Sequence, residues 1–367
     1  MVQMALLKAN NPSQAQLISL LEYYQNGRLS EAEKLATSIT QEFPKHQFAW
    51  KVLGAVLSAT GRKSKAVDAN QKAVTLSPQD TEAHSNLGNS LKELGRLDEA
   101  EACYTQAIAL KPDFIEAHSN LGVTLQELGR LDEAEASYTQ AIALKPDYAE
   151  AHSNLGVTLQ ELGRLDEAEA SNTRAIALKP DYVQAHYNLG NTLKEMGKLE
   201  EAEASYTQAI VLKPDYAEAH YNLGNTLKEL GRLDEAEASY KKTIALNPGF
   251  VEAQHNLGNA LKELGRLEEA EESYRQAIAL KPDYAEAHNN LGVTLQELRR
   301  LDEAEESYAQ AIAARPDYAE AHSNLGNTLQ ELGRLDEAEA SYTKAIALKP
   351  DYAEAHSNMG NTLSELG

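Results

Sequence analysis

Cysteine is nearly absent from this sequence of 367 residues, in which Cys103 is the one example. No disulfide can form within one chain, and no zinc site can be built from several cysteines. Aromatic bulk is also scarce, with one tryptophan and four phenylalanines. Alanine and leucine supply most of the apolar surface, and both residues favour helices. This composition indicates closely packed helices and not a large mixed core.

Positive charge is in deficit, because 34 lysines and arginines face 56 acidic residues, for a formal net charge of −22. Nucleic acids and anionic lipids require clustered basic residues, so we expect neither as a partner. No apolar run approaches the roughly 18 residues that cross a membrane. The apolar stretch from Met4 to Leu7 is much shorter than the core of a signal peptide. We therefore expect a soluble, cytoplasmic protein.

What the sequence has in abundance is internal repetition, with a period of 34 residues. Residues 149–182 differ from residues 115–148 at three of 34 positions. A period of this length indicates stacked units, none of which buries its apolar faces alone. Ten full repeats and one half repeat begin at Ser13, Gln47, Thr81, Ile115, Ala149, Val183, Ala217, Val251, Ala285, Ala319 and Ala353.

These repeats predict the domain organisation. We expect an N-terminal segment at 1–12, two divergent repeats at 13–80, eight regular repeats at 81–352 and a half repeat at 353–367. The half repeat reads as an ordinary first helix, and three interpretations of it stay open. It serves as the terminal cap, or the chain is the front part of a longer protein, or the helix stacks on another copy and builds a filament.

Within each repeat, the apolar spacing predicts two short helices. Gly333 separates them in residues 319–352, because glycine adopts the left-handed conformation at a helix end without steric cost. Pro350 ends the second helix, since proline has no backbone N–H to donate. The apolar residues that form one stripe on each helix are Leu325, Leu329, Leu332, Ala338, Tyr342, Ala345, Ile346 and Leu348.

Acidic residues near the helix starts predict capping boxes. Asp336 would cap the second helix with Glu339 three residues later, and Asp351 would cap the next helix with Glu354. At the other end of a helix, Arg299 stands where the other regular repeats have glycine. A residue with a side chain pays about 1–2 kcal/mol in a left-handed conformation. The sequence therefore predicts local strain at Arg299.

The run Ala-Glu-Ala-His-Ser-Asn-Leu-Gly, followed by Gly-Arg-Leu-Asp-Glu-Ala and then by Tyr, Ala and Pro, resembles the tetratricopeptide repeat (TPR). The family has a large residue at position 4, Leu-Gly at 7–8, Ala at 20, an aromatic residue at 24, Ala at 27 and Pro at 32. The repeats are also similar to the superhelical arm of O-GlcNAc transferase-like proteins. The resemblance implies an all-α, right-handed superhelix, a solenoid whose first helices line a concave groove that holds peptides or partner proteins.

Motifs for catalysis or cofactor binding are missing, so we expect no enzymatic activity, no cofactor and no metal. Paired carboxylates such as Asp336 and Glu337 have the same surroundings in every repeat, whereas an acid–base pair needs two different environments. Histidines fill position 4 at intervals of 34 residues, too far apart to share one ion. We interpret them as packing residues that replace Trp50 of the second repeat: His84, His118, His152, His186, His220, His288, His322 and His356.

The groove carries the candidate binding site. In the family, positions 2, 5, 6, 9, 12 and 13 of the first helix face it. Position 6 is asparagine in nine successive repeats, and its amide would bind a peptide backbone or a neighbouring helix. Positions 9 and 12 vary together, as Val with Gln or as Asn with Lys, and position 5 carries a ring in three consecutive repeats.

Residues 183–284 are therefore the predicted peptide-binding surface, which we call the groove patch. Drift after duplication is the alternative explanation of its composition. The patch consists of Tyr187, Asn188, Asn191, Lys194, Tyr221, Asn222, Asn225, Lys228, His255, Asn256, Asn259 and Lys262.

Taken together, these patterns predict a non-catalytic scaffold that binds a protein or an extended peptide in its groove. Two alternatives stay open. One is a structural protein that assembles end to end into a filament through residues 353–367. The other is the substrate-recognition arm of a longer enzyme, such as a glycosyltransferase.

Overall fold

The computed structural model describes residues 11–366, and its regular secondary structure in that range consists of 21 α-helices. The first helices of the repeats are α1 (Gln14–Gln25), α3 (Gln47–Ala59), α5 (Thr81–Glu93), α7 (Ile115–Glu127), α9 (Ala149–Glu161), α11 (Val183–Glu195), α13 (Ala217–Glu229), α15 (Val251–Glu263), α17 (Ala285–Glu297), α19 (Ala319–Glu331) and α21 (Ala353–Leu366). The second helices are α2 (Leu29–Glu42), α4 (Lys63–Leu76), α6 (Leu97–Leu110), α8 (Leu131–Leu144), α10 (Leu165–Leu178), α12 (Leu199–Leu212), α14 (Leu233–Leu246), α16 (Leu267–Leu280), α18 (Leu301–Ala314) and α20 (Leu335–Leu348).

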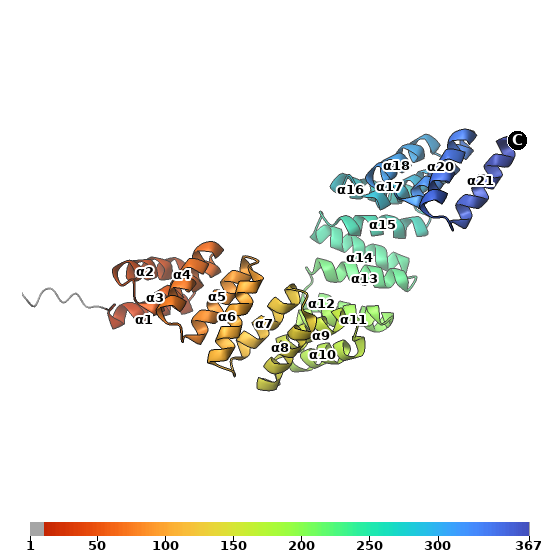
Figure 1. Ribbon diagram of the computed structural model, residues 1–367. Coiled ribbons are helices and arrows are strands. Elements are labelled where there is room, and N and C mark those ends of the chain that lie inside the picture. The colour runs from red at the N-terminus through yellow and green to blue at the C-terminus, as the bar shows by residue number, and fades with distance from the viewer. Residues whose placement is uncertain (1–10, 367) are drawn as a thin grey trace, which may run out of the picture. The chain divides into compact units, whose positions relative to one another are not determined.

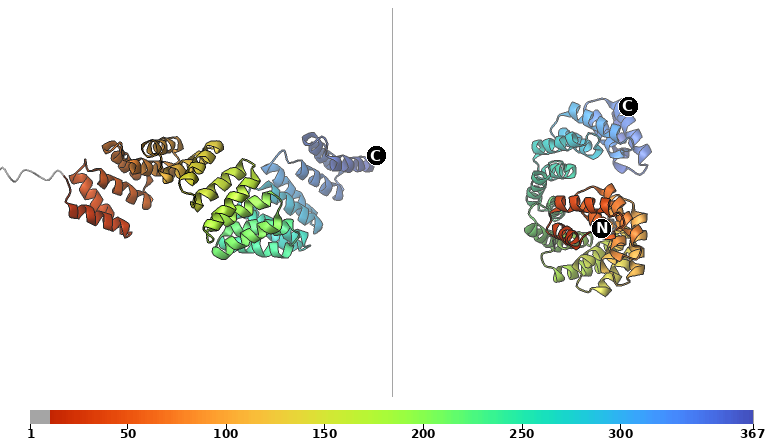
Figure 2. Two further views of the ribbon diagram at one scale, coloured as in Figure 1. Left: turned by 90° about the horizontal axis from the view of Figure 1, so that it is seen from below. Right: turned by 90° about the vertical axis from the view of Figure 1, so that its left-hand side faces the viewer.

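This alternation confirms the predicted all-α solenoid of helical hairpins. The described residues form two compact units, which are divided between Leu189 and Gly190. Within each unit the hairpins stack in chain order, and each helix packs on helices one or two places away (Figures 1 and 2). Residues 1–10 of the predicted N-terminal segment, including the stretch from Met4 to Leu7, lie outside the described residues.

A small set of side chains forms the core of the regular repeats, except that Asn172 replaces the tyrosine in residues 149–182 and Thr243 replaces the last alanine in residues 217–250. In residues 251–284 these are Ala253, Leu261, Ala270, Tyr274 and Ala277, none more than 2% exposed. Tyr274 packs against Gly258 of the facing helix, where an added Cβ would come within 2.6 Å of a ring carbon. The tyrosine at position 24 and the glycine at position 8 are therefore one packing unit, since the ring fills the space that the glycine leaves.

The first helices end where the sequence predicts. Gly333 has a φ of +74°, and Arg299 is the one residue other than glycine with positive φ among the described residues, at 63°. Arg299 thus adopts the left-handed conformation for which strain is predicted. Its side chain is 81% exposed and pairs with Glu331 at 3.1 Å. An ion pair so open to solvent contributes little to stability.

Arg299→Gly should raise the free energy of unfolding by about 1 kcal/mol. Removing the strain gains about 1–2 kcal/mol, and the greater freedom of glycine in the unfolded chain returns about 0.4–1 kcal/mol of it. The reverse change, Gly333→Arg one repeat later, should destabilise by a similar amount. Urea unfolding of both variants measures this, and equal midpoints for the two would contradict it.

The predicted capping boxes at Asp336 and Asp351 are wrong. Helix α20 begins at Leu335, so its N-cap is Arg334, which accepts no hydrogen bond from the helix. The guanidinium instead donates to both oxygens of Glu337, at 2.7 and 2.6 Å. Helix α21 begins at Ala353, two residues after Asp351. Acidic residues in the first turn still interact favourably with the helix dipole.

Side-chain caps occur instead near the N-terminus. Ser13 and Gln16 form a complete capping box at the start of α1. Asp80 accepts a hydrogen bond from the backbone N–H of Ala83 at 3.0 Å, at the start of α5. The regular repeats have Tyr or Phe in the place of Asp80, and those rings offer no acceptor to the helix.

Candidate functional site

The groove patch is carried by three first helices, α11, α13 and α15. Tyr187 and Asn188 lie in the first unit, and the other ten residues lie in the second. In the first unit, the amide nitrogen of Asn188 donates to the hydroxyl of Ser153 at 3.0 Å. The geometry below concerns the second unit, where the structure brings residues of successive helices together.

The asparagine at position 9 links two repeats. The Oδ1 of Asn225 accepts one hydrogen bond from the hydroxyl of Tyr240, at 2.8 Å, and another from the Nδ2 of Asn256, at 2.9 Å. Tyr240 belongs to the same repeat as Asn225, and Asn256 belongs to the next. The same pair of bonds is formed on Asn89, Asn191, Asn259 and Asn327.

These bonds bear on the two interpretations of the asparagines at position 6. The amide nitrogens of Asn120, Asn222, Asn256, Asn290 and Asn358 donate to the preceding repeat at 2.8–3.1 Å. This favours the interpretation that position 6 stabilises the stack. The position 9 amide is different, because its oxygen is held by two donors while the Nδ2 of Asn191 and of Asn225 donates to no described residue.

The buried tyrosine hydroxyl also explains why positions 9 and 12 vary together. In two of the three repeats where position 9 is valine, the hydroxyl finds its acceptor at position 12: Tyr138 donates to Gln126 at 3.4 Å, and Tyr308 to Gln296 at 3.3 Å. The third, residues 149–182, has Asn172 in place of the tyrosine. An Asn/Lys repeat and a Val/Gln repeat are thus two ways to satisfy one buried hydroxyl. Sequence alone shows the covariation but not its cause, since the tyrosine lies on the other helix.

A double-mutant cycle tests this explanation. Asn225→Val should cost about 1–3 kcal/mol, because the hydroxyl of buried Tyr240 loses its acceptor. Lys228→Gln alone should change stability little, and adding it to Asn225→Val should recover most of the loss, because Gln supplies the new acceptor. Urea unfolding of the four proteins gives the coupling energy. Strictly additive changes would contradict a shared hydroxyl.

Two of the rings at position 5, Tyr221 and His255, lie in the joints between repeats. Tyr221 packs on Phe250 with ring centroids 4.8 Å apart and the ring planes tilted by 34°, and its hydroxyl accepts from Asn256 at 3.0 Å. His255 is 9% exposed, and its two ring nitrogens lie 3.3 Å from the Tyr284 hydroxyl and 3.0 Å from the Asn290 amide. Burial lowers the pKa of His255 below its ordinary value. His255 therefore packs between the repeats as a neutral imidazole.

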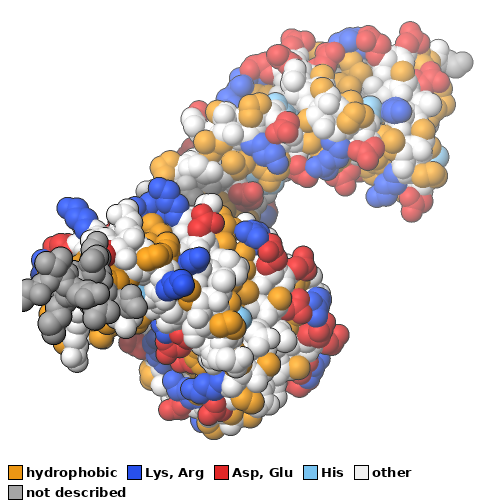
Figure 3. All heavy atoms as spheres, turned by 60° about the vertical axis from the view of Figure 1, so that its left-hand side comes forward, with side chains coloured by type: hydrophobic (Ala, Val, Ile, Leu, Met, Phe, Trp, Pro, Cys, Tyr) orange, Lys and Arg blue, Asp and Glu red, His pale blue; other side chains and the backbone are white. Residues whose placement is uncertain are grey.

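Two of the four lysines at position 12, among the described residues, form ion pairs between repeats. Lys194 pairs with Glu229 and Lys228 with Glu263, each at 3.0 Å, whereas Lys262 has no ion pair within the described chain. A glutamine at position 12 also reaches toward the next repeat, since Gln296 donates a hydrogen bond to Glu331. Acidic and basic side chains are interspersed on the face that Figure 3 shows.

Between α11, α12 and α13 these side chains border an open pocket of about 420 Å³. Its lining residues are Asn191, Lys194, Glu195, Tyr206, Asn222 and Glu229, all in the second unit. Three of them belong to the groove patch. The structure thus brings an amide, an ammonium and a carboxylate together in one recess beside α11 and α13.

The histidines at position 4 have a structural role in every case. The Nε2 of each lies 2.9–3.2 Å from the carbonyl oxygen of the proline six residues earlier. Trp50 donates its indole N–H to Pro44 in the same way, at 3.0 Å. Histidine replaces tryptophan because both rings carry a nitrogen that reaches the loop. Within residues 11–366, no group of three His, Cys, Asp or Glu could hold a metal ion.

Cys103 is the remaining chemically distinctive side chain. Burial raises the pKa of its thiol to about 11, with a smaller contribution from the charge of Glu99. The thiol is therefore protonated at neutral pH, and the thiolate, which is the nucleophile, is scarce.

No helix of the described residues is long and apolar enough to cross a membrane.

Stacked two-helix hairpins that expose a polar row of first-helix side chains define a helical-repeat scaffold. The family model described as the C-terminal domain of cilia and flagella-associated protein 70, a TPR domain, matches residues 9–220. Further tetratricopeptide-repeat models match residues 217–250, 239–272, 258–298 and 283–351. Because the first match covers more than half of the chain, the chain belongs to this family of tetratricopeptide-repeat proteins.

Solved structures show limited similarity to this chain. YrrB, described as a TPR protein with an unusual peptide-binding site, is 26% identical, with a TM-score of 0.45 over 50% of this chain and 95% of YrrB. MamA is 28% identical, with a TM-score of 0.43 over 45% of this chain and 97% of MamA. The Cut9–Hcn1 hetero-tetramer of the APC/C is 13% identical, with a TM-score of 0.48 over 96% of this chain and 97% of that one. A search of curated proteins returns no match.

Proposed function

We propose that this chain is a non-catalytic, cytoplasmic scaffold that binds an extended segment of a partner protein along the first helices of its second unit. The observation that carries the proposal is the recess between α11, α12 and α13, lined by Asn191, Lys194 and Asn222. The asparagine at position 9 supplies the main hydrogen-bond donor of this recess. With the oxygen of Asn191 held by Tyr206 and Asn222, the Nδ2 on the other side of the planar amide is left for a ligand.

The same donor recurs one repeat later at Asn225. Backbone carbonyl oxygens recur along an extended peptide, so they are the acceptors that such a row of amides fits best. The lysine–glutamate pairs beside each amide offer both signs of charge to the side chains of the ligand. The ligand chemistry that follows is an extended peptide recognised through its carbonyl groups.

Conversion of the patch into Val/Gln repeats, a composition that this chain already contains, tests the proposal. The patch variant carries Asn191→Val, Lys194→Gln, Asn225→Val and Lys228→Gln, so each tyrosine keeps an acceptor. The matched control is Asn89→Val with Lys92→Gln, an Asn/Lys repeat outside the patch. Random 12-residue peptides displayed on phage are selected on the whole chain, and their Kd is measured by fluorescence anisotropy.

We expect the Kd of the selected peptides to rise at least tenfold for the patch variant and to stay unchanged for the control. Unchanged affinity in the patch variant, or equal loss in both, would show that the patch is not the binding surface. Circular dichroism and urea unfolding of both variants confirm that the comparison concerns folded proteins.

End-to-end assembly is a second candidate function, favoured by one observation. Helix α21 exposes 44% of Leu363 and 42% of Leu366, and a Cβ at Gly360 would meet nothing within 4 Å. If another copy covers this face, the sedimentation coefficient should grow with concentration, and Leu363→Glu with Leu366→Glu should abolish the growth. A constant monomer mass would reject this candidate.

A further inference from the structure

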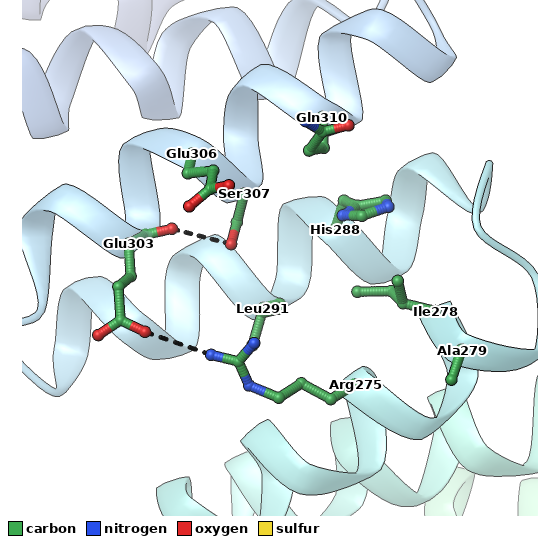
Figure 4. A pocket seen from close by; sticks show the side chains of 9 residues that line it. All are labelled: Arg275, Ile278, Ala279, His288, Leu291, Glu303, Glu306, Ser307 and Gln310. Carbon is green, nitrogen blue, oxygen red and sulfur yellow. Dashed lines mark hydrogen bonds and ion pairs between the residues drawn. The ribbon is translucent and has the colours of Figure 1, made fainter.

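A second surface lies away from the groove, over the joint between residues 251–284 and 285–318. A pocket of about 330 Å³ opens there between α16, α17 and α18 (Figure 4). Its residues from α17 are His288 and Leu291. At 100° per residue, they lie on the side of the helix away from the groove position Val293. The pocket is therefore separate from the groove patch.

The pocket combines an apolar side with a charged one. Ile278 and Ala279 of α16 and Leu291 of α17 supply the apolar side. Glu306, Ser307 and Gln310 project from α18 across from them (Figure 4). Glu303 and Arg275 line the remaining part and are joined by an ion pair of 3.3 Å.

The charge of Arg275 is already compensated, but that of Glu306 is not. Arg275 bonds to Glu271 at 2.9 Å as well as to Glu303. The carboxylate of Glu306 forms no hydrogen bond or ion pair with any described residue, although Gln310 lies one turn further along α18. One repeat earlier, the equivalent Glu272 accepts a hydrogen bond from Gln276 at 2.6 Å.

Glu306 is also unusual among the regular repeats. Position 22 is alanine in six of the eight, and only Glu272 and Glu306 differ. The pocket therefore presents an exposed carboxylate, which has no ion-pair partner among the described residues, beside the apolar side chains of Ile278, Ala279 and Leu291. Lysine and arginine match this arrangement, because their methylene stems lie on apolar surface while the cationic head meets an anion.

We propose that this pocket receives a basic side chain, lysine or arginine, of a partner protein. The stem lies along Ile278 and Leu291, the cation meets Glu306, and the side-chain oxygen of Gln310 accepts a further hydrogen bond. The net charge of −22 attracts a basic partner before contact is made. This surface is independent of the groove, so a partner could be held on both sides of one repeat.

The probe for the test is N-acetyl-arginine methylamide, titrated into the whole chain with methyl NMR of Ile278 and Leu291. N-acetyl-norleucine methylamide is the neutral analogue with a similar stem. The variants are Glu306→Ala and the matched control Glu272→Ala, both of which restore the alanine of most repeats and so preserve the fold.

We expect saturable shifts of both methyl groups with the arginine compound, a Kd at least tenfold higher in Glu306→Ala, and an unchanged Kd in Glu272→Ala. The neutral analogue should give no saturable shift at the same concentrations. Absence of saturable shifts, equal weakening in the two variants, or equally tight binding of the neutral analogue would each overturn the proposal. None of these outcomes depends on the groove patch.

Discussion

Gly292→Ala should destabilise the second unit by about 1–3 kcal/mol, although it adds a single methyl group. An ideal Cβ at Gly292 lies 2.6 Å from a ring carbon of Tyr308, which is fully buried. The ring cannot move away, because the next repeat covers it. The two helices must therefore separate, and the packing of both neighbouring joints loosens. Urea unfolding and hydrogen exchange around α17 and α18 measure the loss.

Gly360→Ala is the matched control, because Gly360 occupies the same position 8 in α21. An added Cβ there meets nothing within 4 Å. Alanine is favoured over glycine in a helix by up to about 1 kcal/mol, so this change should be neutral or stabilising. Similar losses from the two substitutions would show that the helix backbone, and not the contact with the tyrosine, sets the requirement for glycine.

Tyr274→Ala should have a larger effect still, about 3–5 kcal/mol, which is typical of a buried aromatic side chain removed from a core. Tyr274 is fully buried and packs in the cluster that includes Leu261, Ala270 and Leu291. Its loss leaves a cavity between two repeats. Because neighbouring repeats stabilise one another, protection from hydrogen exchange should fall in α15–α17 before it falls elsewhere in the unit.

Tyr274→Phe separates packing from hydrogen bonding at the same site. The hydroxyl donates to Asn259 at 2.8 Å, but the same oxygen of Asn259 also accepts from Asn290 at 3.0 Å. The acceptor is therefore not left unpaired, and the loss should be only about 0.5–1.5 kcal/mol. If the two variants lost equal stability, the hydrogen bond and not the ring would dominate the joint.

The sequence predicts the packing of this protein well, because packing follows local spacing. The stripe that contains Tyr342, the helix end at Gly333 and the strained Arg299 are all found where the pattern puts them. The capping boxes fail for a local reason as well. Asp336 has the expected spacing to Glu339, but the helix begins one residue earlier, at Leu335, and so the acid lies inside the first turn.

The site is harder to predict, because its hydrogen bonds join residues on different helices. The hydroxyl of Tyr240 reaches an acceptor 15 residues earlier, and Asn256 reaches one 31 residues earlier. Neither of these separations along the sequence corresponds to the spacing of contacts within one helix. The covariation of positions 9 and 12 can be read from the sequence as ligand preference, whereas the structure shows that it also keeps a buried hydroxyl satisfied.

In the repeat at residues 319–352 the buried tyrosine hydroxyl has two acceptors within reach. The hydroxyl of Tyr342 lies 2.8 Å from the side-chain oxygen of Asn327 and 3.2 Å from that of Gln330. Such a repeat stands midway between the Asn/Lys and Val/Gln kinds, and either acceptor could be lost from it without stranding the hydroxyl. An Asn/Lys repeat can therefore become a Val/Gln repeat in two steps, lysine to glutamine and then asparagine to valine, and the tyrosine hydroxyl keeps an acceptor at each step. This chain contains the intermediate kind of repeat as well as both of the others.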